Sequence, residues 1–275
     1  MIDTSLLFQD PQPGIYETGM SFDGIKITAC DGSTLLARVL TAGGRKDELH
    51  PAVLLLHGFP GNEQNMDMAQ SLRRAGFTVV TFHYRGNWGS GGQYRLAHLP
   101  EDAESVLNYM KAEHKALGID PQRIFLLGHS MGGFTTFELL SRRVPMAGAV
   151  LMAPCDIEYM YAEDRAAFSA LVDGTEDYFR MDSSRIFYEE CAAHTEDWRF
   201  TSFAQKADPA VPLLFVGGTD DVTCSPEHHI SPARDILLQR GAEADCVILE
   251  DGHCFDSHRC GLITVIAEWL AKKAQ

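Results

Sequence analysis

Residues 124–133 read Ile-Phe-Leu-Leu-Gly-His-Ser-Met-Gly-Gly, a short apolar run that ends in a glycine-rich turn around Ser130. The apolar run has the length of a strand that is buried on both faces, and residues 131–142 have the apolar spacing of a helix. A serine on such a strand-to-helix turn needs small neighbours, because side chains at Gly128 and Gly132 would collide with the two elements. The pattern predicts that the Ser130 hydroxyl is an exposed nucleophile at the carboxyl end of a sheet. The alternative is a glycine-rich turn with an idle serine.

Similar apolar runs recur on both sides of this stretch, and most are followed by a segment of helical periodicity. The predicted buried strands are residues 52–56, 77–82, 124–127, 147–152, 213–216 and 246–249. The predicted helices are residues 63–75, 100–117, 131–142, 231–240 and 259–273. Residues 25–29 and 34–40 flank a turn and predict an opening β-hairpin. This alternation is typical of an α/β protein with one doubly wound, mostly parallel sheet and right-handed crossovers.

Residues 155–205 interrupt the alternation, because they contain no convincing buried strand. We interpret them as a helical cap inserted into one domain that spans residues 1–275. The stretch holds ten of the 26 aromatic residues of the chain, and its twelve acidic residues against four arginines give a net charge of −8. An aromatic cap suits an apolar or aromatic acyl group, although the same side chains could simply attach the cap to the body. A negative cap disfavours anionic substrates, although a solvated face would explain the charge equally well.

Composition excludes several classes of partner. The chain has 275 residues, of which 45% are hydrophobic and 22% charged, as in an ordinary globular protein. Its 23 basic and 38 acidic residues give a net charge of −15, which disfavours nucleic acid and anionic membrane surfaces. The seven cysteines never have C-x-x-C spacing, so we expect reduced thiols and a cytoplasmic protein rather than a disulfide framework. We expect neither a signal peptide nor a membrane span, because the necessary apolar runs are missing.

Two further strand ends carry the partners that a nucleophilic serine requires. Asp220 and Asp221 follow the predicted strand 213–216, and His253 follows the predicted strand 246–249. A base must take the serine proton and an acid must orient that base, and loops at one edge of a parallel sheet converge. Sequence analysis therefore places a serine, a carboxylate and an imidazole at the same edge.

Other histidines compete for these roles or for a metal. His258 begins the last predicted helix, so we interpret it as a surface or capping residue and prefer His253 as the base. The adjacent pair His228 and His229 has divergent side chains and no carboxylate cluster at ligand spacing. We therefore predict no metal site.

The chain resembles the α/β-hydrolase superfamily over nearly its whole length, from about residue 50 to 260. Within the superfamily it is most similar to short prolyl-oligopeptidase-like hydrolases and to cinnamoyl- or feruloyl-esterase-like carboxylesterases. The resemblance lies in the motifs HGFPG at 57–61, YRG at 84–86, GHSMGG at 128–133, GTDD at 218–221 and DGH at 251–253. It implies a triad of Ser130, Asp220 and His253, an oxyanion hole formed by the backbone N–H groups of Phe59 and Met131, and no cofactor.

The choice of acid stays open between neighbouring carboxylates. In the family the carboxylate lies three residues after a glycine and three residues before a small or β-branched residue. Gly217, Asp220 and Thr223 match that spacing, which favours Asp220 over Asp221. Asp156, which follows the strand 147–152, is a remoter candidate, because some relatives carry the acid there.

The loop of residues 84–92 also lies at the predicted active edge. It could hold substrate against Arg85 or Trp88, or it could be a glycine-built turn in which Arg85 binds neighbouring backbone.

The first functional hypothesis is a serine carboxylesterase for small-molecule esters. The second is a small serine peptidase of prolyl-oligopeptidase type, and the third is a non-catalytic hydrolase-fold binding protein. Haloalkane dehalogenation is disfavoured, because it needs a carboxylate where Ser130 stands. The oligomeric state stays open, a homodimer included.

Overall fold

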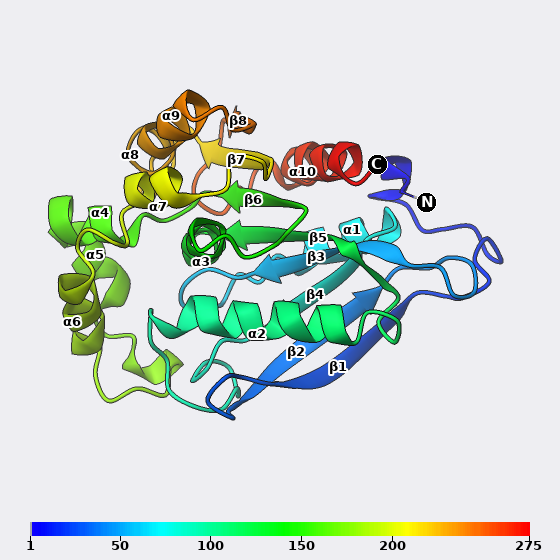
Figure 1. Cartoon of the computed structure of the whole chain (residues 1–275), viewed down its shortest axis with the longest axis horizontal. Helices are drawn as coiled ribbons and strands as arrows, with labels where there is room; N and C mark the ends of the chain where they lie inside the picture. The colour runs from blue at the N-terminus through cyan, green and yellow to red at the C-terminus, as the bar shows by residue number, and fades with distance from the viewer. Residues whose placement is uncertain (1) are drawn as a thin grey trace.

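The computed structural model describes residues 2–275, and Met1 lies outside the described residues. Within residues 2–275, eight strands form one sheet in the order β1-β2-β4-β3-β5-β6-β7-β8 (Figure 1). The strands are β1 Ser21–Thr28, β2 Thr34–Thr41, β3 His50–Leu56, β4 Thr78–Phe82, β5 Ile119–His129, β6 Gly148–Met152, β7 Leu213–Gly218 and β8 Ala244–Leu249. β1 and β2 form an antiparallel hairpin, β2 is antiparallel to β4, and the strands from β4 to β8 are parallel. The predicted fold class, a mostly parallel α/β sheet, is confirmed.

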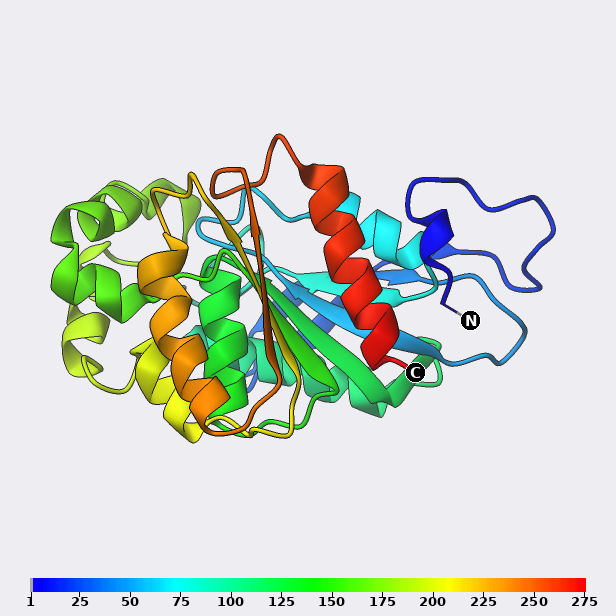
Figure 2. The ribbon, with the colours of Figure 1, turned by 90° about the horizontal axis from the view of Figure 1, so that it is seen from above.

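Helices cover both faces of the sheet, as Figure 2 shows from above. α1 Met66–Arg74 and α10 Arg259–Lys273 pack on one face together with the short 3-10 turn η1 Thr4–Leu6. α2 His98–Ala112, α3 Met131–Ser141 and α9 Ser231–Gln239 pack on the other face, and the short α8 Pro226–His229 precedes α9. Among the helices of residues 2–275, none combines the length and the apolar character needed to cross a membrane.

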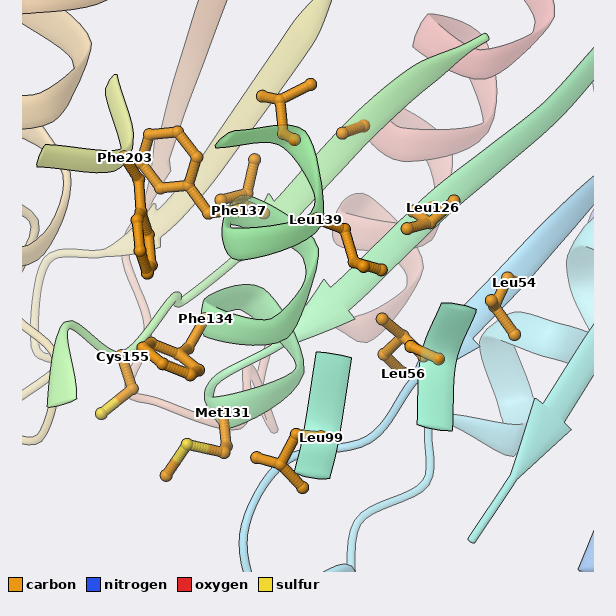
Figure 3. Close-up of a cluster of buried hydrophobic side chains, with 14 of the residues drawn as sticks. Leu54, Leu56, Leu99, Leu126, Met131, Phe134, Phe137, Leu139, Cys155 and Phe203 are labelled. Carbon is orange, nitrogen blue, oxygen red and sulfur yellow. The ribbon is translucent and has the colours of Figure 1, made fainter. Parts of the chain in front are cut away.

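The central strands explain why the two faces have separate cores. Every residue of β3, β4, β6 and β7 is buried. Successive side chains of a strand point to opposite faces, so Leu54 and Leu56 of β3 enter one core while Val53 and Leu55 enter the other. Figure 3 shows Leu54 and Leu56 in the core that they share with Leu126 and the side chains of α3. A parallel sheet buried on both sides brings the carboxyl ends of its strands to one edge, where loops can form a site.

Helices fill the connection between β6 and β7. Within the described residues this connection contains α4 Ile157–Glu163, α5 Arg165–Val172, the 3-10 turn η2 Glu176–Tyr178, α6 Arg185–Ala193 and α7 Phe200–Lys206. In Figure 1, α4, α5 and α6 lie beyond the end of the sheet. Several aromatic side chains of this connection are buried against α3: the ring of Phe134 lies 5.5 Å from that of Trp198, and the ring of Phe137 lies 5.1 Å from that of Phe200. Many of its aromatic residues therefore attach it to the body of the molecule.

Candidate active site

Ser130 lies between the end of β5 and the start of α3, in a strained backbone conformation. Its φ is 55° and its ψ is −115°, a combination that a residue with a side chain rarely adopts. A Cβ on Gly128 would lie 2.0 Å from the carbonyl oxygen of Gly132, and a Cβ on Gly132 would lie 2.1 Å from the carbonyl oxygen of Leu56. Only glycine fits at both positions, so the glycines allow the sharp turn that places Ser130, which is 7% exposed, at the edge of the sheet.

His253 lies after β8 and binds a buried carboxylate, that of Asp221. Its Nδ1–H donates to Oδ2 of Asp221 over 2.8 Å. The other oxygen of Asp221 accepts the backbone N–H groups of Thr223, over 2.9 Å, and Cys224, over 2.7 Å. Burial raises the pKa of Asp221, but the bond to His253, the charge of His253 and the two amides outweigh burial and hold this pKa below its ordinary value. The carboxylate is thus ionised and oriented toward the imidazole.

Asp220, which sequence analysis preferred, does not bind His253, and that prediction is wrong. Asp220 is exposed, and its carboxylate accepts only a 3.3 Å hydrogen bond from the Thr219 hydroxyl among the described residues. The strand β7 ends at Gly218, and Thr219 and Asp220 form a turn in which the backbone N–H of Asp220 donates to the carbonyl of Asp251 and that of Asp221 donates to the carbonyl of Gly218. This turn leaves the Asp220 carboxylate exposed and places the Asp221 carboxylate against His253.

His129 connects the His253 loop to the end of β5. The Nε2–H of His129 donates to the backbone carbonyl of His253 over 3.1 Å, and the two rings lie 5.2 Å apart. His253 therefore contacts His129, the residue that directly precedes Ser130 in the chain. Among residues 2–275, the Ser130 hydroxyl and the His253 ring form no hydrogen bond, and such catalytic bonds often tighten only when substrate binds. His258, the other candidate base, instead lies beside Asp251 at the start of α10.

The two amides expected to form an oxyanion hole belong to segments that adjoin Ser130. A Cβ on Gly58 would lie 3.0 Å from the Cβ of Ser130, so the turn that carries Phe59 lies against the serine. Met131 is the first residue of α3, where backbone N–H groups point out of the helix. Within the described chain, neither the N–H of Phe59 nor that of Met131 donates to a protein acceptor. Both donors are free to bind a negatively charged oxygen.

Arg85 is buried and ion-paired, which favours the structural interpretation of this residue over the substrate-binding one. Its side chain is 2% exposed and pairs with Asp31 at 3.0 Å, Glu101 at 2.6 Å and Asp102 at 2.5 Å. Trp88 differs, because it is 46% exposed and its indole N–H donates to the carbonyl of Pro60 over 3.3 Å. Trp88 therefore lies beside the turn of Phe59 with part of its ring accessible.

Asp156 and the two neighbouring histidines have structural partners. The Asp156 carboxylate accepts the backbone N–H groups of Tyr159 and Phe200, over 3.0 Å and 2.9 Å, and so joins the starts of α4 and α7. Burial raises its pKa to about 6. The backbone N–H of Asp156 donates to Nδ1 of His229, whereas the ring of His228 stacks on that of Tyr159. Asp156 therefore anchors the connection between β6 and β7 and does not face His253.

Three residues beside the His253 loop were not predicted from the sequence: Asn65, His129 and Arg259. They bind one another and the backbone of that loop. His129 lies inside the GHSMGG motif, but nothing in the sequence indicates that its ring reaches residue 253. Asn65 and Arg259 lie 194 residues apart, so no local signal joins them.

Comparisons with known proteins agree with this architecture. A family model described as the alpha/beta hydrolase fold matches residues 51–187. The uncharacterized protein YfhR of Escherichia coli K12 is 29% identical over 124 residues, which cover 44% of this chain and 43% of YfhR. Acylamino-acid-releasing enzyme 1 of rice, Oryza sativa subsp. japonica, is 23% identical over 82% of this chain and 30% of the rice protein. The chain thus spans less than half the length of these two relatives.

A solved structure covers more of the molecule. The esterase Pf2001 of Pyrococcus furiosus superposes with a TM-score of 0.69 at 16% identity, over 93% of this chain and 94% of the esterase. At that identity the likeness is one of fold.

Proposed function

Because this chain belongs to the α/β-hydrolase superfamily, we propose that it is a serine hydrolase that cleaves carboxylic esters with small or aromatic acyl groups. One observation carries the proposal: the buried Asp221 carboxylate binds Nδ1 of His253 at the strand end next to the strained Ser130. A carboxylate that orients an imidazole beside a serine on a strand-to-helix turn is the arrangement that activates a serine hydroxyl.

The reaction follows from this arrangement. Asp221 holds the proton on Nδ1 of His253, so Nε2 can take the proton of Ser130 while its hydroxyl attacks the ester carbonyl. The backbone N–H groups of Phe59 and Met131 stabilise the oxyanion of the tetrahedral intermediate. His253 then donates its proton to the leaving alcohol, which produces an acyl-enzyme. A water molecule deprotonated by His253 releases the acid and restores Ser130, and no cofactor is needed.

The surroundings of Phe59 support an apolar or aromatic acyl group. Its ring lies 4.9 Å from that of Phe179, 5.6 Å from that of Phe187 and 6.1 Å from that of Tyr94. These rings form an apolar cluster next to the proposed oxyanion hole, and the indole of Trp88 binds the carbonyl of Pro60 in the same turn. Apolar walls with few polar groups suit small aromatic ligands.

A serine peptidase or aminoacyl hydrolase is the second candidate. The likeness to the rice acylamino-acid-releasing enzyme supports it, because that likeness extends over 82% of this chain. Ester and amide hydrolysis use the same triad and differ in how strongly the leaving group must be protonated.

The test combines labelling with matched substitutions. A fluorophosphonate should label Ser130, and Ser130→Ala should lower kcat on short p-nitrophenyl esters by roughly 10³-fold or more. Asp221→Asn should lower kcat by roughly 10²- to 10⁴-fold. Asp220→Asn removes the adjacent carboxylate, which is exposed, and should leave kcat within about twofold of the original protein. Each of these two substitutions removes one negative charge from the same loop, so a difference in kcat between the variants identifies which aspartate orients His253.

The substrate panel decides between the candidates. Turnover of esters well above that of aminoacyl amides supports a carboxylesterase, and a preference for the amides supports the peptidase. A protein that turns over neither class and resists the fluorophosphonate is a non-catalytic member of the superfamily. Loss of activity in Asp220→Asn with retention in Asp221→Asn would contradict the proposed triad.

A further inference from the structure

The loop that carries His253 lies between β8 and α10, outside regular secondary structure, yet two of its successive backbone carbonyls are held by side chains. The Nε2–H of His129 donates to the carbonyl of His253 over 3.1 Å. The guanidinium of Arg259 donates to the carbonyl of Cys254 over 3.2 Å. Loops are generally more mobile than the elements they connect, so these two bonds restrict the segment on which the proposed base depends.

The two bonds belong to one continuous chain of hydrogen bonds. The carboxylate of Asp67 accepts two bonds from Arg259, over 2.8 Å and 2.5 Å. Both terminal nitrogens of Arg259 donate to Oδ1 of Asn65, each over 3.1 Å. Nδ2 of Asn65 lies 3.4 Å from Nδ1 of His129, and Nε2 of His129 reaches the carbonyl of His253. A carboxylate is thus linked to the backbone of the proposed base through three side chains.

Only one arrangement of protons satisfies every link. A guanidinium can only donate, so the side-chain oxygen of Asn65 must face Arg259 and its NH₂ group must face His129. Nδ1 of His129 then accepts, which places the ring proton on Nε2. The carbonyl of His253 can only accept, and Nε2–H supplies the donor. Asn65 is fully buried and His129 is 2% exposed, so water does not compete easily for these bonds.

We propose that Asn65, His129 and Arg259 are positioning residues that fix the proton of His129 on Nε2 and thereby hold the backbone of His253 in register with Ser130. Asn65 immediately precedes α1 and Arg259 begins α10, two helices that pack on the same face of the sheet (Figure 2). We call the chain of hydrogen bonds from Asp67 through Arg259, Asn65 and His129 to the His253 carbonyl the relay. It joins these two helices and the end of β5 at one point. Its catalytic consequence rests on the proposed function, but the placement of the His253 loop does not.

Asn65→Asp tests the donor and acceptor roles along the relay, because the aspartate side chain has almost the same shape as that of asparagine. The new carboxylate can still accept from Arg259, but it presents an acceptor to Nδ1 of His129. A neutral His129 can then donate to the carboxylate or to the His253 carbonyl, and only a doubly protonated ring can do both. Burial of His129 opposes that extra proton most strongly, and the charges of His253 and Arg259 oppose it too, whereas Asp221 and the new carboxylate favour it.

The expected signature is a pH-dependent loss of turnover. At pH 8.5, where His129 is neutral, Asn65→Asp should lower kcat by roughly 10- to 100-fold with KM within about threefold, because small misplacements of a catalytic group cost about this much. As the pH falls, the new carboxylate favours protonation of the ring, which restores both bonds, so the ratio of variant to original kcat should rise. A general loss of stability would lower activity without this pH dependence.

Substitutions at His129 and Arg123 supply controls. The amide of His129→Gln can accept from Asn65 and donate to the His253 carbonyl, so this variant should keep kcat within about tenfold, whereas His129→Leu can do neither and should lose more. Arg123 also joins a carboxylate to a backbone carbonyl, those of Asp120 and Ala274, far from the site in the fold. Arg123→Ala should therefore leave kcat and its pH profile unchanged.

Proton NMR gives a readout that does not require activity. The proton between His253 and Asp221 should give a sharp downfield resonance in the original protein, and this resonance should broaden or disappear in Asn65→Asp at pH 8.5. If the protein hydrolyses no ester, the proposed function fails, but the resonances of the original protein and of Asn65→Asp still test the relay. An unchanged resonance together with an unchanged kcat in Asn65→Asp at pH 8.5 would overturn the relay, as would a loss of kcat that His129→Gln shares fully with His129→Leu.

Discussion

Two buried histidines end neighbouring strands of the sheet, and their hydrogen bonding differs. His57 follows β3 and His129 ends β5, where Leu56 pairs with Gly128. Both rings are at most 4% exposed. Burial lowers the pKa of His57 to about 4, and burial together with the nearby His253 lowers the pKa of His129 to about 3. Both nitrogens of His129 face partners from other parts of the chain, whereas the polar contact of His57 is local.

At the end of β3, the ring of His57 forms its hydrogen bond within its own turn. Nδ1–H of His57 donates to the carbonyl of the next residue, Gly58, over 2.7 Å, and Nε2 has no partner among the described residues. Within the same described range, Thr81 Oγ1 and Nδ1 of His83 also lack partners, and the rings of His57 and His83 lie 5.7 Å apart. The ring of His57 therefore binds only the adjacent carbonyl, and Asn87 and Trp88 hold the same turn at the carbonyl of Pro60, whereas the ring of His129 itself holds a loop that is distant in sequence.

The largest expected effect concerns the contact between the two strand ends. Gly132 lies in the first turn of α3 against the carbonyl of Leu56, so Gly132→Ala should destabilise the protein by at least about 3 kcal/mol, because backbone must move. Gly261 lies in the first turn of α10 with open space around its Cα, and Gly261→Ala should be neutral or stabilise by up to about 1 kcal/mol. Urea unfolding measures both, and equal midpoints would contradict the contact.

The next effect concerns the charge of the two histidines. Their folded pKa values are depressed from the ordinary 6.5, so their contribution to stability is present above about pH 6.5 and is lost as pH falls toward the folded values. At pH 5 each histidine should cost about 2 kcal/mol relative to pH 7.5. His57→Gln and His129→Gln should each reduce this loss by about that amount in urea unfolding at the two pH values. A loss unaffected by either substitution would show that other groups cause it.

The smallest expected effect comes from removing a hydroxyl that forms a hydrogen bond, compared with removing one that has no partner, near the two strand ends. Thr136 is buried in α3 and donates to the carbonyl of Gly132 over 2.8 Å, so Thr136→Val should destabilise the protein by about 1 kcal/mol. Thr81 is buried in β4 beside the end of β3, and its hydroxyl has no partner among residues 2–275. Thr81→Val should be neutral or slightly stabilising. If the two variants unfold at the same urea concentration, the difference between the two ends has no energetic consequence.

The elements could be predicted from sequence because their signals are local. Continuous apolar runs predicted the buried strands, and glycine spacing predicted the turn at Ser130, where a Cβ on Gly128 or Gly132 would overlap backbone. The acid could not be predicted with the same accuracy. Asp220 and Asp221 are both plausible in the family pattern, and the assignment depends on the conformation of the turn that follows β7. Arg85 was ambiguous for a similar reason, because its three carboxylate partners come from distant segments.

By itself, the sequence determined the fold class, the strained serine turn and the convergence of three loops at one edge, because strand periodicity and turn chemistry act over a few residues. Only the tertiary structure decided which carboxylate faces His253 and which side chains hold its loop. Those choices depend on the conformation of the turn that follows β7 and on hydrogen bonds between residues up to 194 positions apart. A hydrogen bond depends on distances of a few tenths of an ångström, and packing of the whole chain sets such distances.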